Sequence, residues 1–282
     1  MNFSIVTPSF RNSNWLKLCI ASVADQGVDL EHIVQDAGSD DGTLDWLTRD
    51  PRVRAFVEAD AGMYDAVNRG LRRANGDILA YLNCDEQYLP GALRRAGAFF
   101  QAHPEAEVVF ADAIVVDGDA RYLCHRMALR PLKWHSLVSG NLSVLTCATF
   151  FRRSVIERGH FFNPVLRSVG DAEWIARLID AGVPMAVMRE FTSVFTEVGS
   201  NLGLGPDSAK DRALLRETMP AWACRLRWLF ILQHRIRRAI AGHYRSLTPF
   251  SYEIYSLAQP TERATFRAEK PTFRWVRKGL AA

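Results

Sequence analysis

Along the first 110 residues, segments with two different spacings of apolar residues alternate. Short runs rich in β-branched and aromatic residues predict strands, and longer segments with apolar residues three or four apart predict helices. Strands that alternate with helices indicate βαβ units and a mostly parallel sheet covered by helices on both faces. The expected strands are 3–7, 31–35, 53–57, 77–82 and 107–110, and the expected helices are 15–24, 43–48, 63–74 and 91–102.

The pattern is looser in the second half of the chain. It predicts β-like runs at 113–116, 142–151 and 186–196, a helix at 171–181, and a Gly-rich stretch at 199–206 that is either a closing loop or a spacer. We therefore expect one α/β domain over 1–217 and a second region, 218–282, that is basic and rich in aromatic residues.

Polar residues and glycines follow each of the first four expected strands. The carboxyl ends of parallel strands meet at one edge of a sheet, and ligands of α/β proteins bind there. The sequence therefore predicts a binding rim at this edge, built from residues 7–9, 36–42, 58–62 and 83–86.

The end of the fourth strand is the most informative of these segments. Asn83, Asp85 and Glu86 follow an apolar run directly, and their oxygen atoms suit a hard cation such as Mg²⁺ or Mn²⁺, which in turn can hold a diphosphate. The alternative is that Asp85 or Glu86 caps the helix that begins near Pro90.

Composition excludes several other classes of protein. The 282 residues are 48% hydrophobic and 23% charged, as in ordinary globular proteins, and no apolar run is long enough to span a membrane. The five cysteines lack metal-ligand spacing, and the start of the chain lacks the basic region of a cleaved leader, so we expect a reducing, cytoplasmic location. Dinucleotide-binding and P-loop glycine motifs are absent, and the histidines show no metal-binding spacing.

The chain contains four motif-like segments, IVTPSF at 5–10, HIVQDAGSDDGT at 32–43, DAGMYDAVNRG at 60–70 and LNCDE at 82–86. In this order and spacing they resemble family 2 glycosyltransferases, which have the GT-A fold. The resemblance covers about residues 2–217 and is strongest for enzymes that build bacterial exopolysaccharide or lipopolysaccharide. It implies inverting transfer from a nucleoside-diphosphate sugar, best matched by a UDP-sugar, to a glycan or lipid-linked acceptor with Mg²⁺ or Mn²⁺.

The resemblance also implies roles for single residues. Asp36 would accept the imide N–H of uracil, unless it only caps the following turn, and Asp85 would bind the metal, with Glu86 close by. Asn68 and Gly70 are either site residues or helix residues that face the sheet. The implied donor-binding residues are Thr7, Pro8, Ser9, Asp36, Gly38, Ser39, Asp60, Asp65, Asn83 and Asp85.

Three positions depart from the family pattern. Asn83 is a neutral residue at the first position of the metal motif, Glu86 stands where Asp is usual, and Ala61 stands where an Arg is frequent. These departures keep open a second hypothesis, a GT-A protein that has lost its chemistry and binds partners in a polysaccharide-synthesis complex.

The catalytic base is expected at the start of the helix after residue 170. The resemblance places Asp171 at the position of a general base, which removes the proton of the acceptor hydroxyl as it attacks the anomeric carbon. Asp171 could instead cap the helix, Glu173 is a rival base, and Arg177 is expected to be structural. Residues 145–153 match a segment on the acceptor side of the family, or form a plain core strand.

The C-terminal region carries the positive charge of the chain. From Thr218 onward there are 12 Lys/Arg and 3 Asp/Glu, a net of +9, whereas the rest has a net of −5. Residues 221–245 predict a helix with a Trp/Leu/Phe/Ile face and six arginines, a pattern typical of a helix in a membrane interface. The alternative is a helix docked on the enzyme, and no pattern favours nucleic acid. We therefore expect a cytoplasmic protein, peripheral at the inner face of the membrane.

Overall fold

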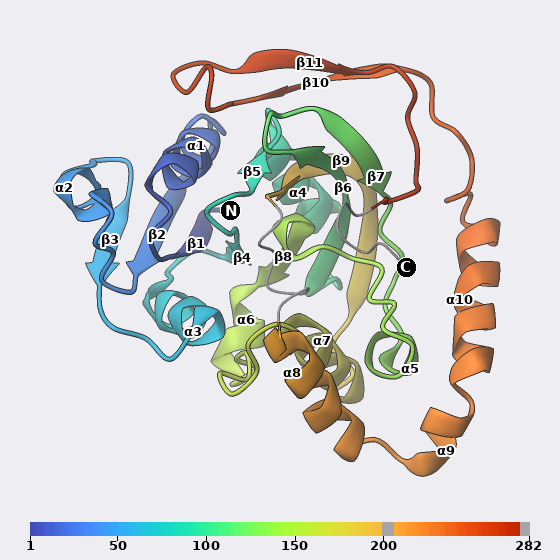
Figure 1. The fold of residues 1–282 in the computed structure, drawn as a ribbon. Helices are drawn as coiled ribbons and strands as arrows, with labels where there is room; N and C mark the ends of the chain where they lie inside the picture. The colour runs from blue at the N-terminus through green and yellow to red at the C-terminus, as the bar shows by residue number, and fades with distance from the viewer. Residues whose placement is uncertain (199–205, 277–282) are drawn as a thin grey trace.

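The computed structural model describes residues 1–198 and 206–276. Its centre is a mixed sheet in which the order is β3-β2-β1-β4-β8-β6-β9-β5, with β7 paired to β6 (Figure 1). The strands are β1 Phe3–Ser9, β2 Leu30–Asp36, β3 Arg54–Val57, β4 Ile78–Tyr81, β5 Gln87–Tyr88, β6 Val108–Asp117, β7 Tyr122–Arg126, β8 Thr149–Arg152 and β9 Met185–Glu197.

The sheet has a parallel part and a mixed part. Strands β3, β2, β1 and β4 are parallel neighbours, as the sequence predicts. Beyond β4 the chain adds β8 antiparallel to both β4 and β6, whereas β6 and β9 are parallel. Two expected β runs, 107–110 and 113–116, are one strand, β6. Only the end of the expected run 142–151 is a strand, because the short 3₁₀ helix Thr146–Ala148 comes first.

Helices cover both faces of the sheet. Phe3 and Ile5 of β1 pack with α1 and α4, and Val6 packs with α3 and α7, because successive side chains of a strand point to opposite faces. The helices are α1 Ser13–Ala24, α2 Thr43–Leu47, α3 Met63–Arg73, α4 Ala92–Ala102, α5 Lys133–Leu137, α6 Arg153–Glu157, α7 Gly170–Asp180, α8 Pro206–Glu217, α9 Ala221–Arg225 and α10 Arg227–Ile240.

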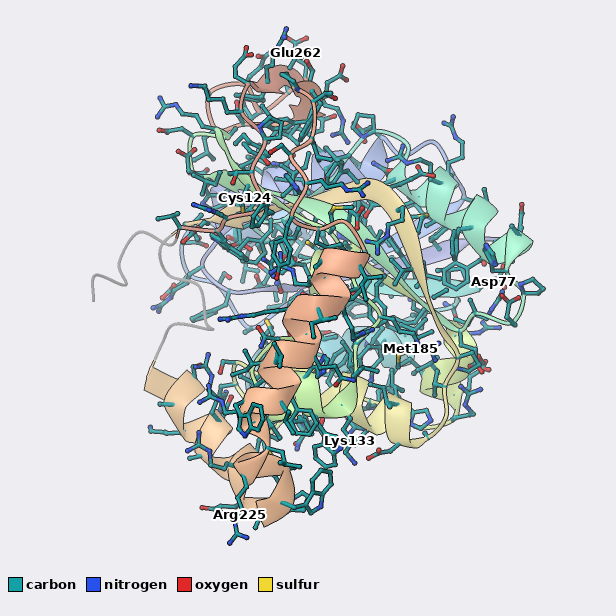
Figure 2. All side chains as sticks on the ribbon, turned by 90° about the vertical axis from the view of Figure 1, so that its right-hand side faces the viewer. Asp77, Cys124, Lys133, Met185, Arg225 and Glu262 are labelled. Carbon is teal, nitrogen blue, oxygen red and sulfur yellow. The ribbon has the colours of Figure 1, made fainter. Side chains whose placement is uncertain are left out.

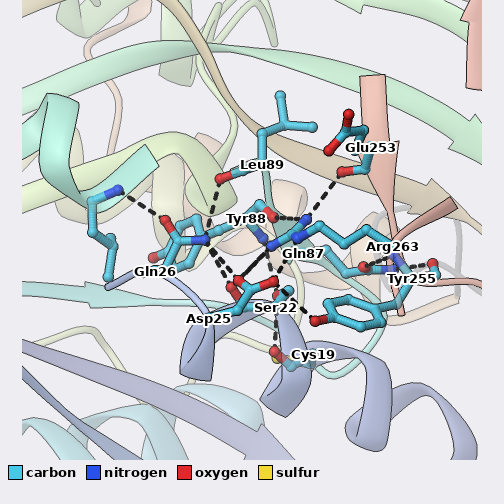
Figure 3. Close-up of polar contacts among 11 residues, drawn as sticks. Cys19, Ser22, Asp25, Gln26, Gln87, Tyr88, Leu89, Glu253, Tyr255 and Arg263 are labelled. Atoms are coloured by element: carbon cyan, nitrogen blue, oxygen red, sulfur yellow. Dashed lines mark hydrogen bonds and ion pairs between the residues drawn. The ribbon is translucent and has the colours of Figure 1, made fainter. Parts of the chain in front are cut away.

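The C-terminal region packs against the body of the protein. The expected helix over 221–245 is divided at Leu226 into α9 and α10, and a hairpin of β10 (Phe250–Ile254) and β11 (Ala264–Ala268) follows. Figure 3 shows how Arg263 fixes this hairpin: its guanidinium pairs with both oxygens of Asp25 at 2.6 and 2.7 Å, and the Tyr255 hydroxyl donates to the same carboxylate. Most of the expected loop at 199–206 lies outside the described residues; α8 begins at Pro206.

Candidate functional site

A cavity of about 1010 Å³ lies beyond the carboxyl ends of β1 and β4. We call its lining residues between 8 and 85 the N-terminal lining and those between 145 and 275 the C-terminal lining. Six predicted site residues lie in these linings: Pro8, Ser9, Asp60, Asn83, Asp85 and Asp171. The structure thus brings Asn83, Asp85 and the expected base to one cavity.

Asp36 lies just behind the cavity and holds the turn after β2. Its Oδ1 accepts the backbone N–H groups of Gly38 and Ser39 at 2.9 and 2.7 Å, and its Oδ2 accepts the hydroxyls of Ser9 and Ser39 at 2.8 Å each. Four donors occupy the roughly four lone-pair sites of a carboxylate. In this arrangement Asp36 caps the turn, and neither Gly38 nor Ser39 is among the residues that line the cavity.

Thr7 and Asp65 also lie outside the lining. The buried Thr7 hydroxyl bonds His32 at 2.9 Å, and burial lowers the pKa of that histidine to about 3, so the ring is neutral. Asp65 is in the first turn of α3, where it accepts the N–H of Ala61 at 3.0 Å and pairs with Arg69 at 2.9 Å. Thr7 therefore links β1 to β2 in the core, and Asp65 supports the loop before α3.

The segment after β4 holds one buried carboxyl, Glu86, and one partly buried carboxyl, Asp85. Glu86 lies beneath the lining, and its Oε2 accepts the backbone N–H of Asn83 at 2.8 Å. Asp85 lines the cavity, and burial raises the pKa of both carboxyls. Neither caps a helix, because α4 begins at Ala92 after Gly91 and has no side-chain cap.

The fit of this segment to a divalent cation rests on two buried oxygens. The side-chain oxygen of Asn83 and Oε1 of Glu86 have no hydrogen-bond partner among the described residues. No three His, Cys, Asp or Glu side chains of 1–198 and 206–276 are grouped as a complete metal site. Mg²⁺ needs only one or two protein carboxylates when phosphates and water supply its other ligands, so the donor set of Asp85 and its neighbours fits such an ion.

Asp171 lies in the first turn of α7 and belongs to the C-terminal lining of the cavity. Burial raises its pKa to about 6. Its backbone N–H donates to the Tyr64 hydroxyl at 3.1 Å, and a Cβ on the preceding Gly170 would meet the Tyr64 ring at 2.6 Å. Glycine at 170 therefore allows the close approach that places Asp171 against α3.

The other candidates near Asp171 have structural contacts. Glu173 is outside the lining and pairs with Arg177 at 2.6 Å, and Arg177 also donates to the carbonyl of Phe161. Asn68 is buried and bonds the backbone of Phe162 through both side-chain atoms. Gly70 packs directly on β1, so Asn68 and Gly70 are helix residues that face the interior.

The segment before β8 divides between cavity and core. Leu145 and Thr146 line the cavity, whereas Phe150 and Phe151 are fully buried in the two core clusters. The core-strand prediction is therefore correct for Phe150 and Phe151, and the acceptor-side role of Leu145 and Thr146 stays a prediction.

No local sequence signal identifies Arg167, which lines the cavity, or Asp211, which holds the loop of Arg167. Arg167 is the only Lys or Arg that lines the cavity among the described residues, and it donates to the carbonyl of Ala61. Its loop is held by the buried Asp211 of α8, which accepts the backbone N–H groups of Arg167 and Ser168 at 2.8 and 2.7 Å. These partners are 44 and 43 residues apart in the chain, so no spacing rule could have found them.

A parallel βαβ half with acidic residues around a cavity at its strand ends agrees with a GT-A-like sugar-nucleotide transferase, because open α/β sheets bind their ligands at that edge. The sequence profile of Glycosyl transferase family 2 matches residues 4–159, more than half of the chain, and the chain belongs to this family.

Relatives of known name agree with this assignment. A PGL/p-HBAD biosynthesis glycosyltransferase of Mycobacterium tuberculosis is 33% identical over 127 residues, which are 43% of this chain and 50% of the relative. An uncharacterized glycosyltransferase of Nostoc is 25% identical over 178 residues, or 58% of this chain and 55% of the relative. The chain thus spans about half the length of these relatives.

Solved structures share the fold. S. aureus TarS 1–349 in complex with UDP-GlcNAc has a TM-score of 0.59 and 19% identity, with 73% of this chain and 61% of TarS covered. The mannosyltransferase PcManGT of Pyrobaculum calidifontis, in complex with GDP-Man and Mn²⁺, has a TM-score of 0.54 and 16% identity, with 87% and 76% covered. At these identities the likeness concerns the fold.

Proposed function

We propose that this glycosyltransferase moves a sugar from a UDP-linked donor to a lipid-linked or growing glycan acceptor, with inversion at the anomeric carbon. The observation that carries the proposal is that Asp85 and Asp171 line one cavity with raised pKa values. Perturbed carboxyls in a cleft are typical of sites that handle protons or cations. TarS and PcManGT, which share the fold, were solved with a nucleotide sugar, and PcManGT also with Mn²⁺.

Asp171 is the general base in this proposal. A carboxyl oxygen of Asp171 takes the proton of the acceptor hydroxyl while the oxygen of that hydroxyl forms its bond to the anomeric carbon. The bond from the anomeric carbon to the diphosphate breaks and its electron pair leaves with the nucleotide, so a single displacement inverts the centre. A pKa of about 6 leaves most Asp171 ionised near neutral pH and still able to accept a proton.

Asp85 and Arg167 are the proposed contacts of the donor diphosphate. A divalent cation bound at Asp85 would offset the charge that develops on the leaving diphosphate. Arg167 reaches the same cavity beside Ala61, the position where the family frequently has an Arg. Asp36 and Glu86, which lie behind the lining, shape the loops that carry Ser9 and Asn83.

A thermal-shift screen of UDP-, GDP- and dTDP-sugars with and without Mn²⁺ tests the proposal. The donor binds the folded state, so it raises the unfolding temperature according to its concentration and affinity. The expected result is a rise with UDP-sugars that is larger with Mn²⁺, followed by release of UDP on incubation. Donor binding without any release would favour the partner hypothesis.

We also propose that α10 lies at an anionic membrane surface. Its inner side packs on the body: the Phe230 ring lies against His135, Gln233 contacts the same histidine, and Arg237 donates to the carbonyl of Arg130. Its apolar stripe faces outward; Trp228 is 62% exposed and Ile240 84%. Figure 2 shows α10 across the front of the molecule with Arg225 at its lower end.

An exposed Trp/Leu/Ile stripe flanked by arginines is typical of a helix that rests in a lipid interface. Docking on the body and membrane contact are therefore compatible, because they use different sides of α10. No helix within 1–198 and 206–276 is long and apolar enough to cross a membrane.

A further inference from the structure

The C-terminal segment returns from the β10–β11 hairpin to the candidate site. Figure 1 shows this red part of the chain running back beside β7. There the carbonyl of Thr272 accepts the backbone N–H of His125 at 2.9 Å and the Tyr122 hydroxyl at 3.1 Å. Three residues later Trp275 lines the cavity, although it lies 104 residues beyond Asp171 in the chain.

Trp275 is held against the end of β9. Its Nε1–H donates to Oε2 of Glu197 at 2.6 Å, and its ring meets Phe195 edge-on with centroids 5.4 Å apart. The guanidinium of Arg126 lies over the ring at 5.7 Å. Phe195 and Glu197 line the same cavity, so three side chains from two distant segments form one aromatic and acidic patch.

The chemistry of this patch suits a neutral sugar. An aromatic ring packs well on the apolar C–H face of a pyranose, and a carboxylate accepts hydrogen bonds from its hydroxyl groups. A diphosphate would be repelled by Glu197, whereas Asp85 with a cation and Arg167 attract it. A cavity of about 1010 Å³ is at the upper end of the range for ligand pockets and has room for two ligands.

We propose that Trp275, Phe195 and Glu197 form a subsite for an uncharged sugar ring of the acceptor, so that the C-terminal segment completes the active site. The inference rests on the proposed transferase function, since it assigns the donor to the other part of the cavity.

Fluorine NMR of the full chain with 5-fluorotryptophan tests the subsite directly. The chain has seven tryptophans, and Trp275→Phe identifies the Trp275 signal by its loss. Methyl glycosides of glucose, galactose, mannose and rhamnose are the probes, because they carry no alkyl chain that would bind the apolar stripe of α10. We expect at least one of them to move the Trp275 signal and to leave that of Trp228 in place. If no glycoside moves the Trp275 signal, or if both signals move alike, the subsite is wrong.

Kinetics give an independent readout. The donor is a UDP-sugar that the wild type hydrolyses, and the acceptor is the glycoside that moved the Trp275 signal. Under these conditions Trp275→Ala should raise the acceptor KM about tenfold. UDP affinity should stay unchanged, and Trp275→Phe, which keeps a flat ring, should restore most of the loss. An unchanged acceptor KM, or an equal loss of UDP affinity, would overturn the assignment.

The two proposals fail in different ways. If UDP and UDP-sugars do not bind the wild type, the proposed donor is wrong, whereas a moved Trp275 signal still supports a sugar subsite. If UDP binds and UDP-sugars are turned over but the Trp275 signal never moves, the result supports the transferase function and contradicts the subsite.

Discussion

The two linings of the cavity are built in different ways. The N-terminal lining, from Pro8 to Asp85, consists largely of strand ends and the short loops that follow them. The C-terminal lining, from Leu145 to Trp275, combines the start of α7 and the end of β9 with a loop and a terminal segment that are held by polar contacts between distant residues. The strand ends of the sheet place most of the first lining, whereas single polar anchors hold Arg167 and Trp275 in the second.

This difference predicts different consequences of substitution. Changes in the N-terminal lining should act on donor binding, and changes at Asp171 or Trp275 should act on transfer. Arg167 belongs to the C-terminal lining but approaches Ala61 of the N-terminal half, so it tests whether the division holds.

Asp85→Ala should have the largest effect, the loss of the Mn²⁺-dependent rise in unfolding temperature with UDP. The reason is that Asp85 is the carboxylate of the metal motif that reaches the cavity. Asp119→Ala is the control, because Asp119 is exposed and lies outside the lining, so this variant should leave the rise in place. A full Mn²⁺-dependent rise in Asp85→Ala would reject the metal assignment.

Asp171→Asn should lower transfer by about 10²-fold or more while UDP affinity stays unchanged. Asparagine is nearly isosteric but does not accept the proton of the acceptor. Glu173→Gln should retain transfer, because Glu173 is paired with Arg177 away from the cavity. If the two variants behave in the opposite way, Glu173 is the base.

The same substitution should stabilise the free protein at alkaline pH. Burial raises the pKa of Asp171 from 3.8 to about 6, so the ionised form is disfavoured in the folded state. Ionisation of Asp171 therefore lowers the free energy of unfolding of the wild type by at most about 3 kcal/mol. This loss of stability is absent well below pH 3.8 and complete well above pH 6. In urea unfolding without ligand, Asp171→Asn should therefore be more stable than the wild type at pH 8 and differ from it much less at pH 4, and an equal difference at both pH values would contradict this.

Arg167→Ala should weaken UDP binding about tenfold and UMP binding little, because a charged hydrogen bond to the second phosphate is lost. Titration calorimetry measures both affinities. Arg49→Ala, an exposed arginine away from the cavity, is the matched control. An equal loss for UDP and UMP would mean that Arg167 acts on the loop rather than on the phosphate.

Replacing Arg225, Arg227 and Arg235 with Glu should weaken sedimentation with anionic liposomes by about fivefold per residue at low salt. These three arginines are exposed. The control is the same charge change at Arg49, Arg121 and Arg267, which lie elsewhere on the surface. Equal binding by both triple variants would leave α10 as a purely structural helix.

The local pattern of the sequence was enough for the parallel half of the fold. The expected strands and helices of the first 102 residues agree with β1 to β4 and α1 to α4 within a few residues, because strand and helix periods are local properties. Short elements without a periodic signal were missed, among them β5, β7, α5 and α6, since long-range pairing and packing decide them.

By itself, the sequence determined the family, the rim of strand ends, and Asp85 and Asp171 as candidate carboxylates of the site. Only the tertiary structure decided that Asp36 and Glu86 support loops, and that Arg167 and Trp275 line the cavity. The reason is physical: a motif names residues that are neighbours in the chain, whereas the free lone pairs of a carboxylate and the reach of a side chain depend on partners far along it. Asp211 and Glu197 are such partners, and no local pattern identifies them.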